Sequence, residues 1–137
     1  MKDIQKFESI MNESKLIALA TSVKDSPNVR LVNFILKNNK VYFISDPDDN
    51  KFSEFAQNNK VAFSTIPIDM NTHVRVKDAV IKFGITTFDK ISEDYFEKYP
   101  ENKNIPQTIR EKMVVCEIEL KKVILILGMN DIIELNL

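Results

Sequence analysis

The feature of this chain that most restricts its fold is a succession of short apolar segments with turn residues between them. Runs such as "LIALATSV", "VYFIS" and "KVAFSTIP" are bounded by Pro, Asn and Asp. Apolar runs of this length and with these boundaries are typical of β-strands, and their close spacing leaves room for short helices only. We therefore expect strands at 16–23, 28–36, 41–45, 60–67, 73–88, 114–120, 123–128 and 131–137.

The connections between these segments favour antiparallel pairing. "KNNK" at 37–40 predicts a tight hairpin turn, because asparagine tolerates positive φ nearly as well as glycine. "KDSP" at 24–27 is interpreted as a turn that contains Pro27. Short amphipathic helices are expected at 3–13, after Asp48 or Asp49, and from Ser92. The pattern predicts a mainly β, largely antiparallel barrel or sandwich, with a bend near Gly84 and one domain over residues 1–137.

Charge and cysteine content restrict partners and compartment. Lys and Arg total 19 against 20 Asp and Glu, so no field of one sign covers the molecule and a nucleic-acid partner is not expected. The N-terminus is polar and the apolar runs are short, so we expect neither a secretory signal nor a membrane span. A single cysteine, Cys116, excludes an internal disulfide and fits a reducing compartment. Because Cys116 alternates with Val114, Ile118 and Leu120, we expect its thiol in the core. We expect a cytoplasmic protein.

Several common site types are excluded. The chain has only two glycines, Gly84 and Gly128, so it lacks the Gly-rich loops of Walker A and dinucleotide-binding sites. It contains no HExxH or CxxC motif, and we expect no metal site. No Ser-His-Asp set stands out, and catalytic residues stay unknown. Any phosphate bound here must therefore be held by side chains and ordinary backbone amides.

One arginine is placed unusually. In "VRLVNFIL" (29–36), Arg30 alternates with Val32, Phe34 and Leu36, which are expected to face the core. A buried guanidinium needs an anionic or hydrogen-bonding partner. One interpretation is an arginine at the exposed start of a strand, snorkelling or paired with a nearby carboxylate. The other is a binding site for an anion.

Ser45 and Lys51 favour the second interpretation. Ser45 ends the strand at 41–45, and Lys51 begins the helix that follows. We expect Arg30 on a central strand, and if 28–36 and 41–45 pair as a hairpin, Arg30 and Ser45 lie toward the same end, within reach of Lys51. Arginine offers a fork to phosphate, lysine a point charge, serine a hydroxyl and the helix start free N–H groups. The alternative is a solvated lysine and a turn serine.

The segment "KLIALATSVKDSPNVRLVNFILKNNKVYFISDPDDNKFSEFAQNNKVAFS" (15–64) resembles the FMN-binding split-barrel family typified by pyridoxamine 5'-phosphate oxidase. The shared pattern is an "AT" strand, a proline turn, an arginine-bearing strand, a strand ending in Ser or Thr, a lysine and an "N-x-x-V" sequence. Every step occurs here in this order. The similarity continues more weakly through "HVRVKD" to "VILILG".

The resemblance implies an antiparallel split β-barrel of Greek-key topology with short flanking helices. It also implies a homodimer with FMN at the subunit interface and a small-molecule substrate beside the flavin. In that family the arginine, the lysine and the strand-end hydroxyl hold the phosphate, and the backbone after the arginine lines the flavin ring. A polar residue at the head of "HVRVKD" lies against that ring. The implied cofactor-binding residues are Arg30, Leu31, Val32, Asn33, Ser45, Asn50, Lys51 and His73.

The sequence also departs from the family's pattern. Asp46, Asp48 and Asp49 crowd the loop before Lys51, where relatives more often carry small or basic residues, and carboxylates there repel a phosphate. Asp78 stands where many relatives have a glycine. The last residues, "MNDIIELNL", lack the arginine and histidine that bind the substrate phosphate in true pyridoxamine phosphate oxidases, so we do not expect vitamin B6 oxidation.

Three functional classes remain open, of which the third is a dimeric scaffold that binds no cofactor. The first is an FMN-binding oxidoreductase-like protein of undefined substrate, in which the flavin carries the redox chemistry and the protein holds and tunes it. The second is a non-catalytic, dimeric split-barrel protein that binds flavin or haem. Haem would need an axial ligand, and His73 is the only histidine of the chain.

Overall fold

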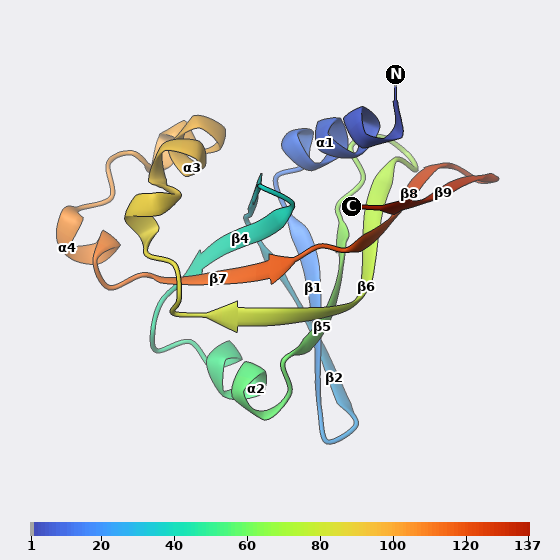
Figure 1. Cartoon of the computed structure of the whole chain (residues 1–137). Coiled ribbons are helices and arrows are strands. Elements are labelled where there is room, and N and C mark those ends of the chain that lie inside the picture. The colour runs from blue at the N-terminus through green and yellow to red at the C-terminus, as the bar shows by residue number, and fades with distance from the viewer. Residues whose placement is uncertain (1) are drawn as a thin grey trace.

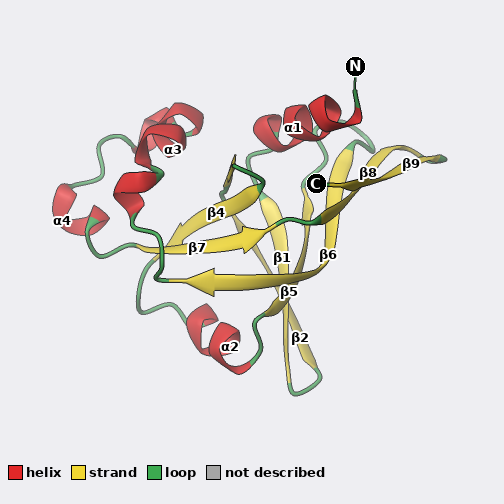
Figure 2. Cartoon of the chain, viewed as in Figure 1, coloured by secondary structure: helices red, strands yellow, loops and turns green. Residues whose placement is uncertain are grey.

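The chain folds into a curled, mainly antiparallel sheet with short helices around it (Figures 1 and 2). A computed structural model describes residues 2–137. The helices of these residues are α1 (Asp3–Glu13), α2 (Lys51–Gln57), α3 (Ser92–Lys98) and α4 (Gln107–Arg110). The strands are β1 (Ile17–Val23), β2 (Ser26–Val32), β3 (Ile35–Lys37), β4 (Lys40–Ser45), β5 (Lys60–Thr65), β6 (His73–Phe83), β7 (Val114–Glu119), β8 (Lys122–Gly128) and β9 (Asp131–Asn136).

The order of the strands makes this sheet a split barrel. They follow one another as β2-β1-β5-β6-β7-β4-β3, while β8 pairs with β6 and with β9. The long strand β6 belongs to both halves, because its first residues pair with β8 and its last with β7. Figure 1 shows the two halves diverging from β6, with α2 at one end and α3 and α4 beside β4 and β7. The mainly β split-barrel prediction is confirmed.

The bend in β6 lies at Asp78 and not near Gly84 as predicted. Asp78 has a φ of 49°, which lies in the left-handed region that residues with a Cβ adopt at a cost. It separates the part of β6 that pairs with β8 from the part that pairs with β7. Gly84, with a φ of 75°, follows the last residue of the strand.

The single strand predicted at 28–36 is two strands in the structure. β2 pairs with β1 and β3 pairs with β4, and Asn33 and Phe34 form the break between them. β2 is therefore an edge strand of the sheet, whereas the hairpin argument placed Arg30 on a central one. The hairpin turn between β3 and β4 is confirmed, since Asn38 and Asn39 have φ of 53° and 59°.

The first hairpin also differs from its prediction. Its turn residues are Lys24 and Asp25, both at positive φ, and Pro27 lies inside β2 instead of in the turn. An edge strand accepts proline because one row of its N–H groups has no partner strand. The position of Pro27 therefore agrees with β2 being the edge.

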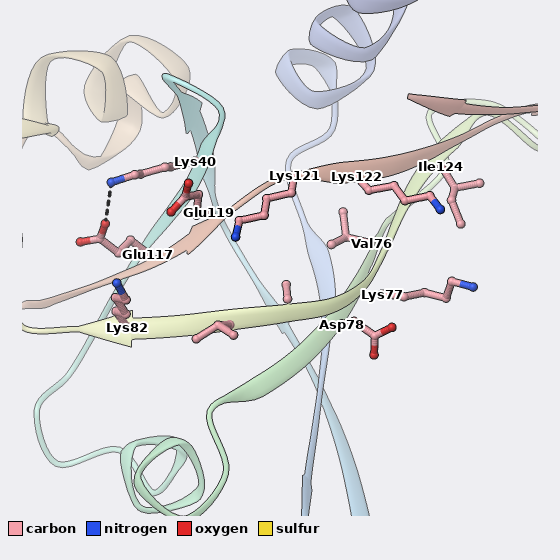
Figure 3. Close-up of a pocket in the computed structure, with 12 residues that line it drawn as sticks. Lys40, Val76, Lys77, Asp78, Lys82, Glu117, Glu119, Lys121, Lys122 and Ile124 are labelled. Atoms are coloured by element: carbon pink, nitrogen blue, oxygen red, sulfur yellow. Dashed lines mark hydrogen bonds and ion pairs between the residues drawn. The ribbon is translucent and has the colours of Figure 1, made fainter. Parts of the chain in front are cut away.

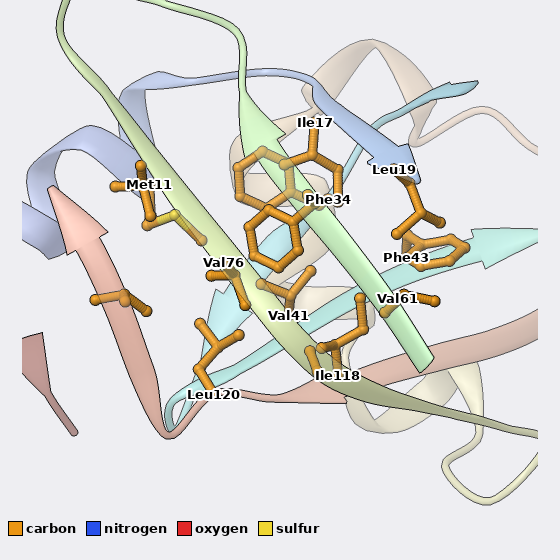
Figure 4. Packing of buried hydrophobic residues seen from close by; sticks show 14 of the residues in the cluster. Met11, Ile17, Leu19, Phe34, Val41, Phe43, Val61, Val76, Ile118 and Leu120 are labelled. Carbon is orange, nitrogen blue, oxygen red and sulfur yellow. The ribbon is translucent and has the colours of Figure 1, made fainter. Parts of the chain in front are cut away.

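The apolar side chains form two cores. The larger fills the barrel, where α1 contributes Met11 and the strands contribute Leu19, Phe43 and Ile118 (Figure 4). Cys116 is fully buried there, as its alternation with apolar neighbours predicted. No helix within residues 2–137 combines the length and the apolar character needed to cross a membrane.

The smaller core lies between the sheet and the helical segment that precedes β7. Its buried members are Ile35, Tyr42, Phe88, Ile91, Tyr95, Tyr99 and Val115. Tyr99 fixes this segment to the break between β2 and β3, because its hydroxyl accepts the N–H of Phe34 at 3.0 Å. The same hydroxyl lies 2.8 Å from the carbonyl of Phe34 and 2.9 Å from that of Lys15. Burial raises the pKa of Tyr99 to about 12, so this hydroxyl stays protonated.

Candidate functional site

A buried lysine joins the end of β4 to the start of α2. Lys51 is the first residue of α2 and only 8% exposed. Its Nζ donates to the hydroxyl of buried Ser45 at 2.8 Å and lies 3.1 Å from a carboxylate oxygen of Asp49. The other oxygen of Asp49 accepts the backbone N–H of Lys51 at 2.9 Å. The structure therefore brings Ser45 and Lys51 together, and Asp49 takes an N–H of the first helical turn that was expected to serve a ligand.

Arg30 forms an ion pair with Glu54 of α2. The two side chains are 19% and 22% exposed, so the pair is largely shielded from water. Glu54 also accepts hydrogen bonds from the hydroxyl of Thr21 at 3.0 Å and from the side-chain amide of Asn28 at 3.4 Å. An arginine can therefore lie in this apolar strand because a carboxylate from α2 compensates its charge.

That compensation is incomplete. The ion pair engages Nη2 of Arg30, while Nη1 is buried and has no hydrogen-bond partner among residues 2–137. A buried donor without an acceptor is unfavourable and needs an explanation. A guanidinium presents its donors as a planar fork that matches two oxygens of a phosphate or carboxylate group. The orphaned Nη1 fits a site for a further anionic oxygen, and a phosphate carries three.

The charges of Arg30 and Lys51 both act on Asp49. The backbone N–H of Lys51 holds the pKa of Asp49 below its usual value, and the positive charges of Lys51 and Arg30 lower it further. Asp49 therefore lies in the field of both cations, although β2 and β4 do not pair as the hairpin argument assumed.

Glu54 is the second carboxylate of this neighbourhood. Burial works to raise the pKa of Glu54, but the hydrogen bonds from Thr21 and Asn28 and the charge of Arg30 bring it below its usual value. Both Asp49 and Glu54 are thus ionised at neutral pH, one on each cation. We call Arg30, Ser45, Asp49, Lys51 and Glu54 the anion cluster.

The remaining predicted residues lie outside the anion cluster. Leu31 is 59% exposed on the outer side of β2, and Val32 is partly buried. Asn33 lies in the break after β2, where its amide donates to the carbonyl of Lys15 at 3.0 Å. Asn50 is exposed in the turn before α2. These four positions flank the cluster along the chain without contributing to its ion pairs.

His73 lies apart from the cluster. β1 and β5 separate its strand, β6, from β2, a spacing of about 14 Å between strand axes. His73 alternates with buried Val74, so it faces outward, whereas Arg30 is in register with buried Leu19 and faces inward. Its Nδ1 lies 2.7 Å from the carbonyl of Asn71, and the Nε of Arg75 donates to its Nε2 at 3.2 Å.

Sequence reasoning missed Glu54 and Thr21. A weak indication existed for Thr21, because it follows Ile17 and Leu19 at the inward positions of β1 and is a polar residue on that apolar face. Glu54 lies 24 residues from Arg30, and its sequence position resembles that of an ordinary surface residue on a short helix. In the acidic loop, Asp49 contacts Lys51, while Asp46 accepts the N–H of Asp48 at 2.9 Å and shapes the turn.

A cavity of the described residues lies away from the anion cluster. A hollow of about 530 Å³ opens at the bend of β6, where β7 and β8 diverge (Figure 3). Lysines and carboxylates surround it, among them Lys40, which pairs with Glu117 at 3.2 Å. None of the residues predicted to bind the cofactor lines this hollow. The candidate site therefore rests on the anion cluster and not on the size of a cavity.

Comparisons with solved structures agree with the fold. A NimC/NimA family protein from Clostridium acetobutylicum superposes with a TM-score of 0.70 at 19% identity, covering 98% of this chain and 95% of its own. An FAD-binding protein from Mesorhizobium loti gives 0.65 at 15% identity, covering 90% and 92%. HutZ, a haem storage protein from Vibrio cholerae, gives 0.72 at 13% identity, covering 92% and 96%. At these identities the likeness shows the split-barrel fold alone.

The sequence itself matches a family model. A comparison with curated proteins gave no match. The model described as "Pyridoxamine 5'-phosphate oxidase-like" matches residues 10–131, which include β1 to β8 and every residue of the anion cluster. The chain therefore belongs to the pyridoxamine 5'-phosphate oxidase-like family.

Proposed function

We propose that this protein binds FMN through its anion cluster and acts as a flavin-dependent oxidoreductase on a small molecule. The observation that carries the proposal is the pair of neighbouring cations, buried Lys51 and partly buried Arg30, of which Arg30 keeps a buried donor without an acceptor. Ser45 adds a hydroxyl beside the lysine. When bound, the flavin supplies the electron-transfer chemistry, and the residues of this chain bind and orient it.

The chemistry of the cluster favours a phosphate group. Arginine and lysine bind phosphate oxygens through charge-assisted hydrogen bonds, which are about twice as strong as neutral ones. The family to which the chain belongs and its likeness to an FAD-binding protein support a flavin as the carrier of that phosphate. The terminal phosphate of FMN would be held by Arg30, Ser45 and Lys51.

The strand that carries Arg30 also offers a surface for the ring and for a second subunit. Val29 and Leu31 alternate with Arg30 and are 63% and 59% exposed. Exposed apolar side chains gathered on one face indicate an interaction surface. We propose that the backbone at Leu31, Val32 and Asn33, together with Asn50 and the more distant His73, lines the flavin in a homodimer. Sedimentation of Leu31→Glu, which should be monomeric, tests the dimer.

Absorption and fluorescence spectra test the binding proposal. The purified protein is mixed with FMN, freed of excess ligand and measured beside Arg30→Ala and Lys51→Ala. We expect retained flavin bands in the parent protein and a loss of at least about tenfold in affinity in each variant, because each removes a charge-assisted hydrogen bond. Lys37→Ala is the control, since Lys37 pairs with Asp94 on a distant surface. A parent protein that retains no flavin would contradict the proposal.

Haem binding is the second candidate, because HutZ shares the fold. The surroundings of His73 weigh against it. An axial ligand must offer a free ring nitrogen, but Arg75 donates to Nε2 and Nδ1 lies against the carbonyl of Asn71. Haem titration decides between the two functions. A Soret band of bound haem that disappears in His73→Ala supports haem binding through His73, and the spectrum of free haem contradicts it.

A further inference from the structure

Glu54 occupies one position of the anion cluster that a bound phosphate would claim. Its carboxylate takes Nη2 of Arg30, which is one of the two terminal donors of the guanidinium fork. Nη1 beside it is buried without an acceptor among residues 2–137. A phosphate oxygen that reached Nη1 would therefore come next to an ionised carboxylate. The two anions compete for one arginine.

We infer that Glu54 is a specificity-determining residue, an internal acidic competitor that a ligand's phosphate must displace from Arg30. This inference rests on the proposed FMN function and concerns the same site. It makes the site selective, because a small free anion must break the Arg30–Glu54 pair with no further gain. A phosphate monoester joined to a flavin also gains the contacts of the ring, and can therefore meet that cost.

The surroundings of Glu54 explain how it can compete without leaving α2. Thr21 and Asn28 donate to Oε1, whereas Arg30 binds Oε2. The bonds to Oε1 persist if Oε2 gives up Arg30, so the carboxylate keeps hydrogen-bond partners in both states. Thr21 is buried, which holds this anchor in place. Exchange of partners at Arg30 thus requires a small shift of one carboxylate.

Asp49 provides a matched comparison within the cluster. It pairs with Lys51 as Glu54 pairs with Arg30, but its side chain is 40% exposed against 22% for Glu54. Water screens an exposed pair, so its loss changes little. Lys51 also keeps the hydroxyl of Ser45 as a second partner. Removing the charge of Asp49 should therefore affect phosphate binding less than removing that of Glu54.

The test measures dissociation constants for FMN and for riboflavin, which lacks the phosphate, in the parent protein and in Glu54→Gln. The shift of the thermal midpoint with inorganic phosphate is a second measurement. Glutamine keeps an acceptor for Thr21 and removes the charge. We expect Glu54→Gln to bind FMN and inorganic phosphate roughly tenfold or more tightly, since a charge-assisted bond no longer has to be broken. Riboflavin affinity should stay unchanged, and Asp49→Asn should gain less.

The outcomes separate this inference from the proposed function. FMN binding by the parent protein with equal or weaker binding by Glu54→Gln overturns the competitor role and leaves the function standing. Binding of FMN by neither protein overturns both. A gain that riboflavin shares equally also overturns the role, because it would not involve the phosphate. If Glu54→Gln does not fold, Glu54→Asp replaces it: the shorter carboxylate cannot reach Thr21 and Arg30 together, and FMN should bind between two- and tenfold more tightly.

Discussion

Lys98 allows a sharp prediction about the dependence of stability on pH. It ends α3, its ammonium donates to the carbonyl of Met11 in α1 at 2.9 Å, and its Nζ lies 3.8 Å from the centre of the Phe34 ring. Burial, with a smaller contribution from the charge of Lys15, lowers the pKa of Lys98 to about 7. In the unfolded chain the lysine has its ordinary pKa of about 10.4.

The sign follows from proton binding. Between pH 7 and pH 10 the folded protein holds fewer protons at Lys98 than the unfolded chain, so the free energy of unfolding rises with pH in this window. The contribution of Lys98 to stability is complete above the pKa that this lysine has in the unfolded chain, and it is lost as the pH falls to about 7. Each unit of difference corresponds to about 1.4 kcal/mol. The ring of Phe34 and partial contact with water favour the ammonium. We therefore expect the free energy of unfolding to rise by about 2 kcal/mol over this pH window, less than the whole pKa difference would give.

Lys98→Met isolates this contribution, because methionine keeps the length of the side chain and removes the charge. Urea unfolding at pH 6 to 9.5, followed by circular dichroism, gives the free energy of unfolding of the parent protein and of Lys98→Met. The parent protein should gain about 2 kcal/mol relative to Lys98→Met as the pH rises, with parallel curves below pH 6.5. Lys60→Met, at an exposed lysine of β5, should show no such difference. A constant difference between the parent protein and Lys98→Met would refute the reasoning, since it would mean that Lys98 keeps its ordinary pKa.

Two further predictions concern β6 and β7. Asp78→Val should destabilise the protein by roughly 1–2 kcal/mol, because a β-branched residue is strained at a φ of 49°. Lys77→Val, at the neighbouring exposed position of the same strand, should be close to neutral in urea unfolding. Cys116 should resist thiol reagents in the native protein and react at the rate of unfolding, since burial raises the pKa of Cys116 to about 12; fast modification of the native protein at pH 8 would contradict this.

Local patterns were sufficient to predict most of the fold. The helix from Asp3, the turn at Asn38 and Asn39, and the strands of the C-terminal part lie within a few residues of their predicted positions. In each case the information is carried by neighbours in sequence: apolar periodicity, or a residue type that tolerates positive φ. The buried Cys116 was predicted for the same reason, since it alternates with apolar residues along one strand.

Features that depend on distant partners were not predictable in this way. The alternation from Val29 to Leu36 continues through Asn33 and Phe34, yet the chain breaks there, where the hydroxyl of Tyr99 accepts the N–H of Phe34. The bend of β6 was predicted near Gly84 because of its residue type, but β7 and β8 diverge at Asp78 instead.

Some residues of the anion cluster were predicted from the sequence, and others were not. Arg30, Ser45 and Lys51 were found through residue type and the resemblance to the family, and the structure joins Ser45 to Lys51 directly. Glu54 was missed because its role depends on α2 folding back onto β2, which no local pattern encodes. Ion pairs between elements that are distant in sequence are defined by the tertiary structure.

The division of the apolar side chains into two cores has a consequence for the dynamics of the molecule. The helical segment from Phe88 to Arg110 packs through the smaller core; Lys98 fixes it to α1, and Tyr99 fixes it to the break before β3. A segment with its own small core can open while the barrel stays closed, as a separate cooperative unit. Backbone amides of α3 should therefore exchange with solvent through partial opening, before those of β1 and β5, and a protease should cut first within this segment.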